Sequence, residues 1–160
     1  MARTIGRVRI VLQRVSRASV TVDGEVVGAI GHGVLLLVGV GEGDDDAVAA
    51  RMAAKVARLR IFPNDDRGFD RTVVDVHGKA LVVSQFTLMG DVRRGNRPSW
   101  AAAARPEDAS PVVEAVTRAL EAEGVPVATG RFGAVMDVEL VNDGPVTLVL
   151  DSDDLAAARR

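Results

Sequence analysis

The sequence predicts a single compact α/β domain in which Val-rich, mostly antiparallel sheets pack against two main helices. Its 160 residues fit one domain with a sizeable core. Short apolar runs alternate with turn residues, one longer stretch has the 3.6-residue spacing of a buried helix face, and a second begins with a helix start signal. Aromatic residues make up only 3% of the chain, so aliphatic side chains must fill the core. An abundance of Val favours strands.

The first third of the chain predicts three strands. Arg7 to Val15 alternates apolar and polar residues, as a strand with one buried face does. Ala18 to Val22 and Glu25 to Ile30 flank Asp23-Gly24, a strong hairpin signal. Gly33 to Val40 is almost entirely apolar, which is typical of a strand covered on both faces.

The middle of the chain predicts a helix, a loop and a strand. The helix extends from Asp44 to about Arg60, with acidic residues at its start and basic residues at its end. Its expected buried stripe is Val48, Met52, Val56 and Leu59. Pro63 to Asp70 is a polar loop, and Lys79 to Leu88 is the next strand.

The last third predicts a loop, a helix and a strand pair. A loop from Met89 to Ser99 precedes Ser110-Pro111, which signals an N-cap and first turn of a helix ending near Gly124. The final elements are strands at 133–141 and 146–150, joined by a tight turn, and a polar, frayed tail at 151–160.

The composition excludes several kinds of chemistry. With no Cys there is no thiolate nucleophile and no disulfide, and the two His residues, His32 and His77, each lie beside Gly as turn residues do. No metal, nucleotide or serine-hydrolase motif occurs, so we expect no cofactor. The net charge of −2 argues against a basic coat for DNA, and no segment predicts membrane insertion or secretion. We expect a cytoplasmic protein.

Two short segments stand out, although pattern alone gives each an ordinary interpretation. Ser84 to Leu88 is a strand end with Gln85 and Thr87 on one face, and Asn142 to Thr147 contains a tight turn. An X-Pro bond is usually trans. Arg93, Arg94 and Arg97 follow the first segment in a loop that is either simply solvated or contacts phosphates.

Taken together, these segments resemble the D-aminoacyl-tRNA deacylase family of bacteria and eukaryotes. The likeness extends from about Arg7 to Leu150, leaving 1–6 and 151–160 as terminal extensions without an assigned role. Six ordered matches carry it: 13–20 (QRVSRASV), 59–62 (LRIF), 82–88 (VVSQFTL), 95–99 (GNRPS), 129–134 (TGRFGA) and 142–147 (NDGPVT). The chain departs from the family at Arg67 to Asp70 and at Trp100. Ser84-Gln85-Phe86 is typical of the D-specific branch.

The resemblance implies a homodimer that hydrolyses the ester between a D-amino acid and tRNA. Ser84 to Leu88 of one chain would face Gly144-Pro145 of the other, and that Gly-Pro bond would be cis. Its carbonyls would exclude an L side chain, whereas glycyl-tRNA would be accepted. Ser84, Asn142, Gly144, Pro145 and Thr147 would then bind substrate.

Two mechanisms remain open. In the first, the ribose 2′-hydroxyl helps to activate water, and backbone N–H groups near Gln85 and Phe86 stabilise the oxyanion. In the second, Thr87 is the nucleophile, although the sequence offers no adjacent base. A dimeric RNA-binding module without catalysis, or a dimer that binds a small molecule, is the alternative from another class.

Overall fold

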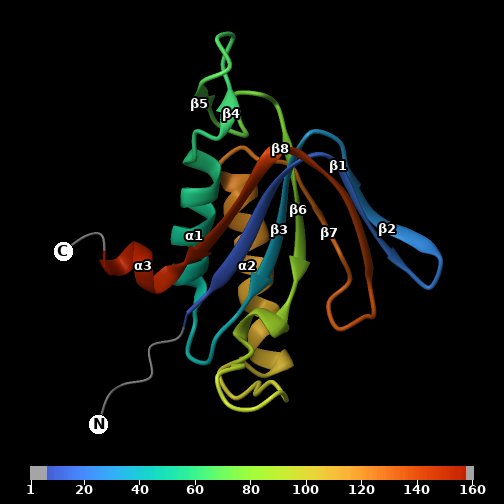
Figure 1. The fold of residues 1–160 in the computed structure, drawn as a ribbon, viewed down its shortest axis with the longest axis vertical. Helices are drawn as coiled ribbons and strands as arrows, with labels where there is room; N and C mark the ends of the chain where they lie inside the picture. Colours follow the sequence, from blue (N-terminus) through green and yellow to red (C-terminus); the bar gives the residue numbers. More distant parts are fainter. Residues whose placement is uncertain (1–6, 158–160) are drawn as a thin grey trace.

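The computed structural model describes residues 7–157 and consists of one curved mixed sheet with two helices on one face (Figure 1). The sheet has six strands in the order β2-β1-β3-β6-β7, with β8 paired to the other edge of β1. Pairs among β1, β2, β3 and β8 are antiparallel, whereas β3-β6 and β6-β7 are parallel. The predicted fold class is confirmed. No helix of the described residues has the length and apolarity that a membrane crossing requires.

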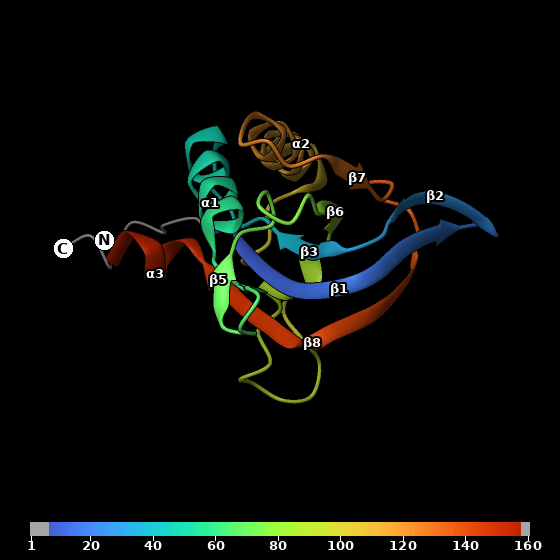
Figure 2. The ribbon, with the colours of Figure 1, turned by 90° about the horizontal axis from the view of Figure 1, so that it is seen from above.

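Strand β1 (Arg9–Val22) is a long strand of 14 residues that pairs along both of its edges. The sequence divided it in two, but it continues without a break. Its first half pairs with β3 (Gly33–Gly39) and its second half with β2 (Glu25–Ile30), across the predicted Asp23-Gly24 hairpin. Strand β8 (Asp137–Asp151) follows its other edge along both halves. Seen from above, β1 and β8 curve together around the same interior (Figure 2).

Alternation along β3 divides the core into two clusters. Val34, Leu36 and Val38 face the helices, whereas Leu35 packs within the concave face of the sheet. The expectation that this strand is covered on both faces is confirmed. Strand β6 (Lys79–Ser84) repeats the alternation, and β7 (Val127–Thr129) completes its edge.

Helices α1 (Asp46–Arg58) and α2 (Pro106–Ala122) lie side by side on one face of the sheet. Asp45 caps α1 by accepting a hydrogen bond from the Val48 N–H, so the predicted start is off by two residues. Met52 and Val56 are buried as expected, but the stripe also contains three alanines that the sequence analysis omitted: Ala49, Ala53 and Ala57. These small residues let α1 and α2 approach closely.

The predicted start of α2 at Ser110-Pro111 is wrong. The helix begins five residues earlier, with Arg105 instead of Ser110 at the N-cap and Pro106 in the first turn. Pro106 gives the proline part of the start signal, but the Arg105 side chain makes no capping hydrogen bond. Glu107 and Asp108 then occupy the first turn, where acidic side chains are stabilised. Pro111 lies inside the helix. The predicted end near Gly124 is confirmed, because Gly124 has a φ of 93° directly after the cap.

The C-terminal segment also differs from the prediction of a frayed tail. Ser152–Ala157 forms helix α3, and the buried Ser152 hydroxyl accepts a hydrogen bond from the Val8 N–H at 3.0 Å. The predicted loop at 63–70 is a small hairpin of β4 (Phe62–Pro63) and β5 (Phe69–Arg71). The first change depends on Val8, a partner far away in sequence, whereas the hairpin pairs neighbouring residues such as Phe62 and Arg71. The rest of the predicted extensions, 1–6 and 158–160, lies outside the described residues.

Asp44 is the most perturbed carboxyl group described. Its Oδ2 accepts the Gly41 N–H at 2.7 Å, while its buried Oδ1 has no hydrogen-bond partner among the described residues. Burial, with a smaller contribution from Asp153, raises the pKa of Asp44 from 3.8 to about 6. The folded state therefore holds this proton more tightly than the unfolded state. Its contribution to stability is present below pH 3.8 and is lost as pH rises through 6.

We therefore expect Asp44→Asn to stabilise the protein at pH 8, where the wild-type carboxylate is charged. Because Asp44 is only partly buried, the expected gain in unfolding free energy is about 1 kcal/mol, less than the shift would give at full burial. The gain should shrink toward pH 4, which urea denaturation at both pH values can measure. Asp46→Asn removes one charge from the same helix start and should give no such gain. Equal gains from both variants would contradict the assignment.

Candidate functional site

The first segment, 84–88, forms a short 3₁₀ turn at the end of β6 instead of a continuing strand. Strand β6 ends at Ser84, and η1 occupies Phe86–Met89. The Gln85 N–H donates to the Val38 carbonyl at 2.8 Å, after which the chain folds across the end of β3. The predicted continuation of the strand to Leu88 is therefore wrong, although the Gln85 and Thr87 side chains do lie together, as expected. Helical backbone, not pleating, sets the direction of these side chains.

Gly39 of β3 makes this arrangement possible. A Cβ at residue 39 would lie 2.9 Å from the Leu88 Cβ and 3.0 Å from the Gln85 carbonyl oxygen. The missing side chain thus lets η1 rest directly on the strand. Met89 is buried behind the turn and anchors it to the core.

A cavity of about 510 Å³ opens beside η1, large enough for a nucleoside with an attached amino acid. Ser84, Gln85 and Phe86 line it, together with Trp100 and Phe132. Phe86 and Trp100 meet edge to face with ring centroids 5.4 Å apart. None of the described residues that line the cavity is ionisable. The site therefore has apolar walls and no side chain able to act as a general base at neutral pH.

The backbone at the start of η1 supplies polar groups near this cavity, which Phe86 lines. At the start of η1, the N–H groups of Phe86 and Thr87 donate to no acceptor among the described residues, as is usual for the first N–H groups of a helix. The Thr87 hydroxyl accepts a hydrogen bond from the Gln85 side-chain amide. An amide cannot remove a proton, so this contact does not activate Thr87 as a nucleophile.

The second segment, 142–147, is not the predicted tight turn. Gln13 pairs with Thr147 and Val15 with Asn142, so Asp143 to Val146 bulges opposite the single residue Arg14. The chain does not reverse, because pairing with β1 resumes on both sides of the bulge. The Gly144-Pro145 peptide bond is cis, as the family resemblance implies and contrary to the general preference for trans.

Arg14 holds this bulge from within the sheet, a role that the sequence analysis missed. Its side chain is only 6% exposed, and its Nε donates to the Asp143 carbonyl at 3.0 Å. The rings of Phe62 and Phe69 lie 5.9 and 5.7 Å from the guanidinium carbon. A Cβ at Gly144 would overlap the guanidinium, so this position requires glycine. The available signal was the alternation of the strand, which places Arg14 on the same face as the apolar residues Ile10 and Leu12.

The two segments lie at opposite ends of the sheet within one chain. Ser84 pairs with Val38 at the end of β3, whereas Arg14, next to the bulge, pairs with Val34 at its start. In Figure 1, η1 is accordingly near the bottom and the β4-β5 hairpin, which contacts Arg14, is at the top. Asn142, Gly144, Pro145 and Thr147 do not line the η1 cavity. A single chain does not bring the predicted site together.

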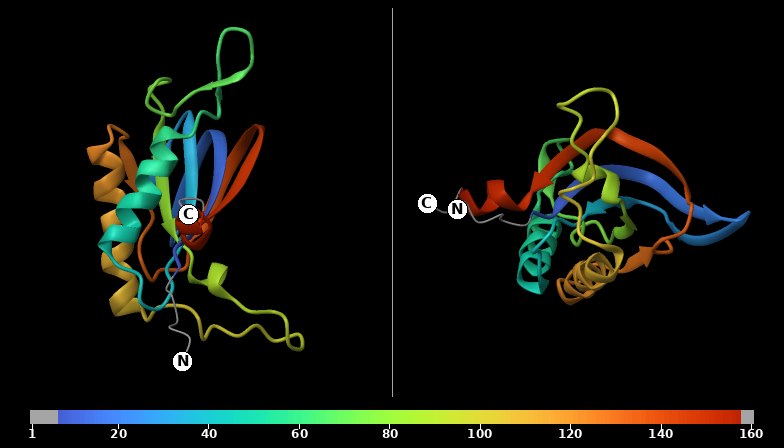
Figure 3. Two further views of the ribbon diagram at one scale, coloured as in Figure 1. Left: turned by 90° about the vertical axis from the view of Figure 1, so that its left-hand side faces the viewer. Right: turned by 90° about the horizontal axis from the view of Figure 1, so that it is seen from below.

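The three predicted RNA-binding arginines lie in a loop that extends from the body of the domain (Figure 3). Arg93 makes a forked ion pair with Asp91, and this contact holds the pKa of Asp91 at about 2. Arg94 and Arg97 are exposed, and no ion pair to either occurs within residues 7–157. These two side chains are the ones free to meet a phosphate.

A larger hollow of about 950 Å³ lies between the starts of α1 and α2, away from both segments. Six acidic residues line it, namely Glu42, Asp44, Asp45, Asp46, Glu107 and Asp108, against the single cation Arg105. Such a surface repels a polyanion, and no group of residues with metal-ligand geometry occurs in the described part of the chain. The η1 cavity is the better candidate for a nucleotide substrate.

Known proteins match nearly the whole chain in sequence and in fold. The family model of D-Tyr-tRNA(Tyr) deacylase matches residues 11–151. Proteins named D-aminoacyl-tRNA deacylase are 59% identical in Roseiflexus castenholzii, over 90% of this chain and 92% of the relative, and 60% identical in Thermomicrobium roseum, over 92% and 96%. The chain therefore belongs to the D-Tyr-tRNA(Tyr) deacylase family.

Two solved structures have the same fold. One, titled c-Myc DNA Unwinding Element Binding Protein, is 37% identical with a TM-score of 0.82, covering 89% of this chain and 97% of its own. The other, titled as a probable eukaryotic D-amino acid tRNA deacylase, has a TM-score of 0.77 at 16% identity, covering 91% and 99%. The second comparison supports the fold alone.

Gly39 offers a direct test of how η1 is supported. We expect Gly39→Ala to push η1 away from β3 and to lower the unfolding free energy by about 1–3 kcal/mol, as overpacking does. Urea denaturation measures this loss. Gly31→Ala is the control, because a Cβ there meets nothing within 4 Å. If both variants were equally stable, close packing at Gly39 would not support the turn.

Proposed function

We propose that this protein hydrolyses the ester that joins a D-amino acid to the terminal adenosine of tRNA. The observation that carries the proposal is the η1 cavity, which has apolar walls and no ionisable side chain. Phe86 lines it at the start of η1, where the Phe86 and Thr87 N–H groups have no acceptor among the described residues. Such a cavity suits a substrate that contributes its own catalytic hydroxyl. Membership of the D-Tyr-tRNA(Tyr) deacylase family supports the same reaction.

In this mechanism the ribose 2′-hydroxyl of the substrate helps to activate water, which attacks the ester carbonyl. Negative charge then develops on the carbonyl oxygen. The free N–H groups of Phe86 and Thr87 are the donors that stabilise it. The C–O bond to the ribose breaks, the ribose oxygen takes a proton, and the free D-amino acid leaves. Gln85 orients the turn through its contact with the Thr87 hydroxyl.

The complete site is shared between two copies of the chain. The separation of the two segments within one chain supports this arrangement, because Gly144-Pro145 can face η1 only from a partner. A two-fold homodimer would form two equivalent sites in this way. The Gly144 and Pro145 carbonyls would then occupy the space that an L side chain needs. Glycine has no side chain, so glycyl-tRNA carried on tRNA for alanine would also be hydrolysed.

Purified protein is expected to release tyrosine from D-tyrosyl-tRNA and to leave L-tyrosyl-tRNA intact. Release is measured from the aminoacyl-tRNA remaining with time, with free tRNA binding measured in parallel. Binding of tRNA without release of the D-amino acid would support the non-catalytic RNA-binding alternative and reject the enzyme.

Light scattering should give about twice the chain mass of 16.8 kDa. Full activity in a monomer would reject the shared site.

Thr87→Ala separates the two mechanisms. If water is the nucleophile, we expect kcat to fall by less than about tenfold, because the variant keeps the backbone N–H of residue 87. Loss of a nucleophile would instead lower kcat by about four orders of magnitude or more. Thr87→Ser keeps a hydroxyl and serves as the matched control, with circular dichroism to compare the folds. Near-total loss in Thr87→Ala with full activity in Thr87→Ser would assign attack to Thr87.

A further inference from the structure

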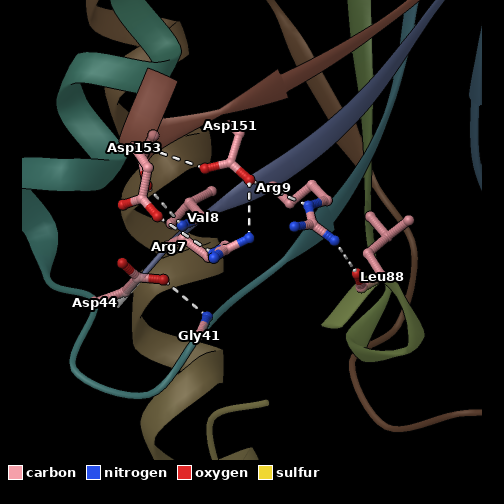
Figure 4. Close-up of polar contacts among 9 residues, drawn as sticks. Arg7, Val8, Arg9, Gly41, Asp44, Leu88, Asp151 and Asp153 are labelled. Atoms are coloured by element: carbon pink, nitrogen blue, oxygen red, sulfur yellow. Dashed lines mark hydrogen bonds and ion pairs between the residues drawn. The ribbon is translucent and has the colours of Figure 1, made fainter. Parts of the chain in front are cut away.

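Arg9 connects β1 to the carbonyl end of η1 (Figure 4). Its Nη1 donates to the Leu88 carbonyl oxygen at 2.9 Å, and its Nε donates to Asp151 Oδ2 at 3.2 Å. The last carbonyls of a helix have no partner within the helix. The arginine therefore satisfies a group that the turn itself leaves unpaired, with a charge-assisted hydrogen bond.

The support behind Arg9 is rigid. Its backbone pairs with Gly39 on one edge of β1 and with Asp151 on the other. Asp151, whose side chain is only 12% exposed, fixes the direction of the guanidinium. The Arg9 guanidinium therefore binds Asp151 at the end of β8 through one nitrogen and the Leu88 carbonyl of η1 through another. Movement of η1 by a fraction of an ångström would break this contact.

We propose that Arg9 is a positioning residue for the deacylase reaction, which holds η1 so that the Phe86 and Thr87 N–H groups meet the developing oxyanion. This inference rests on the proposed function. Arg9 itself does not line the η1 cavity. It acts through Leu88, at the opposite end of η1 from the free N–H groups. Because the turn is short, fixing one end fixes the other.

Arg7 provides a matched control within the same network. Its guanidinium lies 3.7 Å from Asp151 and 3.3 Å from Asp153, so it pairs with the same C-terminal segment as Arg9. No hydrogen bond joins Arg7 to η1 in the part of the chain that the structure describes. Arg7→Leu and Arg9→Leu therefore both remove ion pairs with the C-terminal segment, but only Arg9→Leu removes the hydrogen bond to the Leu88 carbonyl.

Trp100 reports the position of η1 without any substrate. It is the single Trp of the chain. Its ring packs on Phe86 at the start of η1, and its Cζ3 would lie 2.6 Å from a Cβ at Gly90, directly after η1. We expect Arg9→Leu to change the emission maximum and to raise acrylamide quenching of Trp100, whereas Arg7→Leu should keep the wild-type values.

The decisive kinetic experiment compares these variants on D-tyrosyl-tRNA. Arg9→Leu is expected to lower kcat about 100-fold, the effect of misplacing a reacting geometry, with KM within about threefold. Arg9→Lys retains a donor for Leu88 and should recover at least about tenfold of this loss. Arg7→Leu should keep wild-type kcat. Urea midpoints of the two leucine variants should be similar.

The outcomes separate this inference from the proposed function. Wild-type kcat and wild-type Trp100 emission in Arg9→Leu would overturn the positioning role. Equal losses of kcat in Arg7→Leu and Arg9→Leu would also overturn it, since both would then act through general stability. If the wild-type protein released no D-amino acid, the proposed function would fail, while unchanged Trp100 emission in Arg9→Leu would still reject the hold on η1.

Discussion

The pairing of β1 along both of its edges is the constraint on which the rest of the structure depends. Pairing with β3 and β8 places Arg9 and Arg14 on opposite faces of one rigid strand. Arg9 reaches the carbonyl end of η1, and Arg14 reaches the bulge that contains Gly144-Pro145. One strand thus supports both halves of the candidate site, although these halves lie at opposite ends of the sheet.

Glycine and arginine have complementary roles in this support. Gly39 and Gly144 have no side chain, and this leaves room for η1 to pack on β3 and for the bulge to pack on Arg14. Each arginine then donates to a carbonyl that regular pairing leaves without a partner. In the proposed mechanism, this support would hold the Phe86 and Thr87 N–H groups in place, and fixed donors are the effective ones for a developing oxyanion.

Local sequence signals succeeded where a few adjacent residues decide the conformation. The Asp23-Gly24 hairpin, the doubly covered strand at 33–39 and the helix end at Gly124 follow from turn chemistry and apolar pattern. The local sequence signals failed where pairing with a distant segment competes with the local conformational preference. Asn142 to Pro145 has turn chemistry, but pairing with β1 on both sides keeps the segment within β8. Ser84 to Leu88 has strand alternation, but Gly39 lets the chain fold over β3.

By itself the sequence determined the α/β class, the shortage of catalytic side chains and the ordered segments that resemble the deacylase family. These properties depend on which residues are present and in what order. The tertiary structure alone decided that η1 is a 3₁₀ turn with free N–H groups, that Arg14 is buried under the bulge, and that the two segments are separated within one chain. Each of these depends on contacts between residues tens of positions apart, which no local pattern encodes.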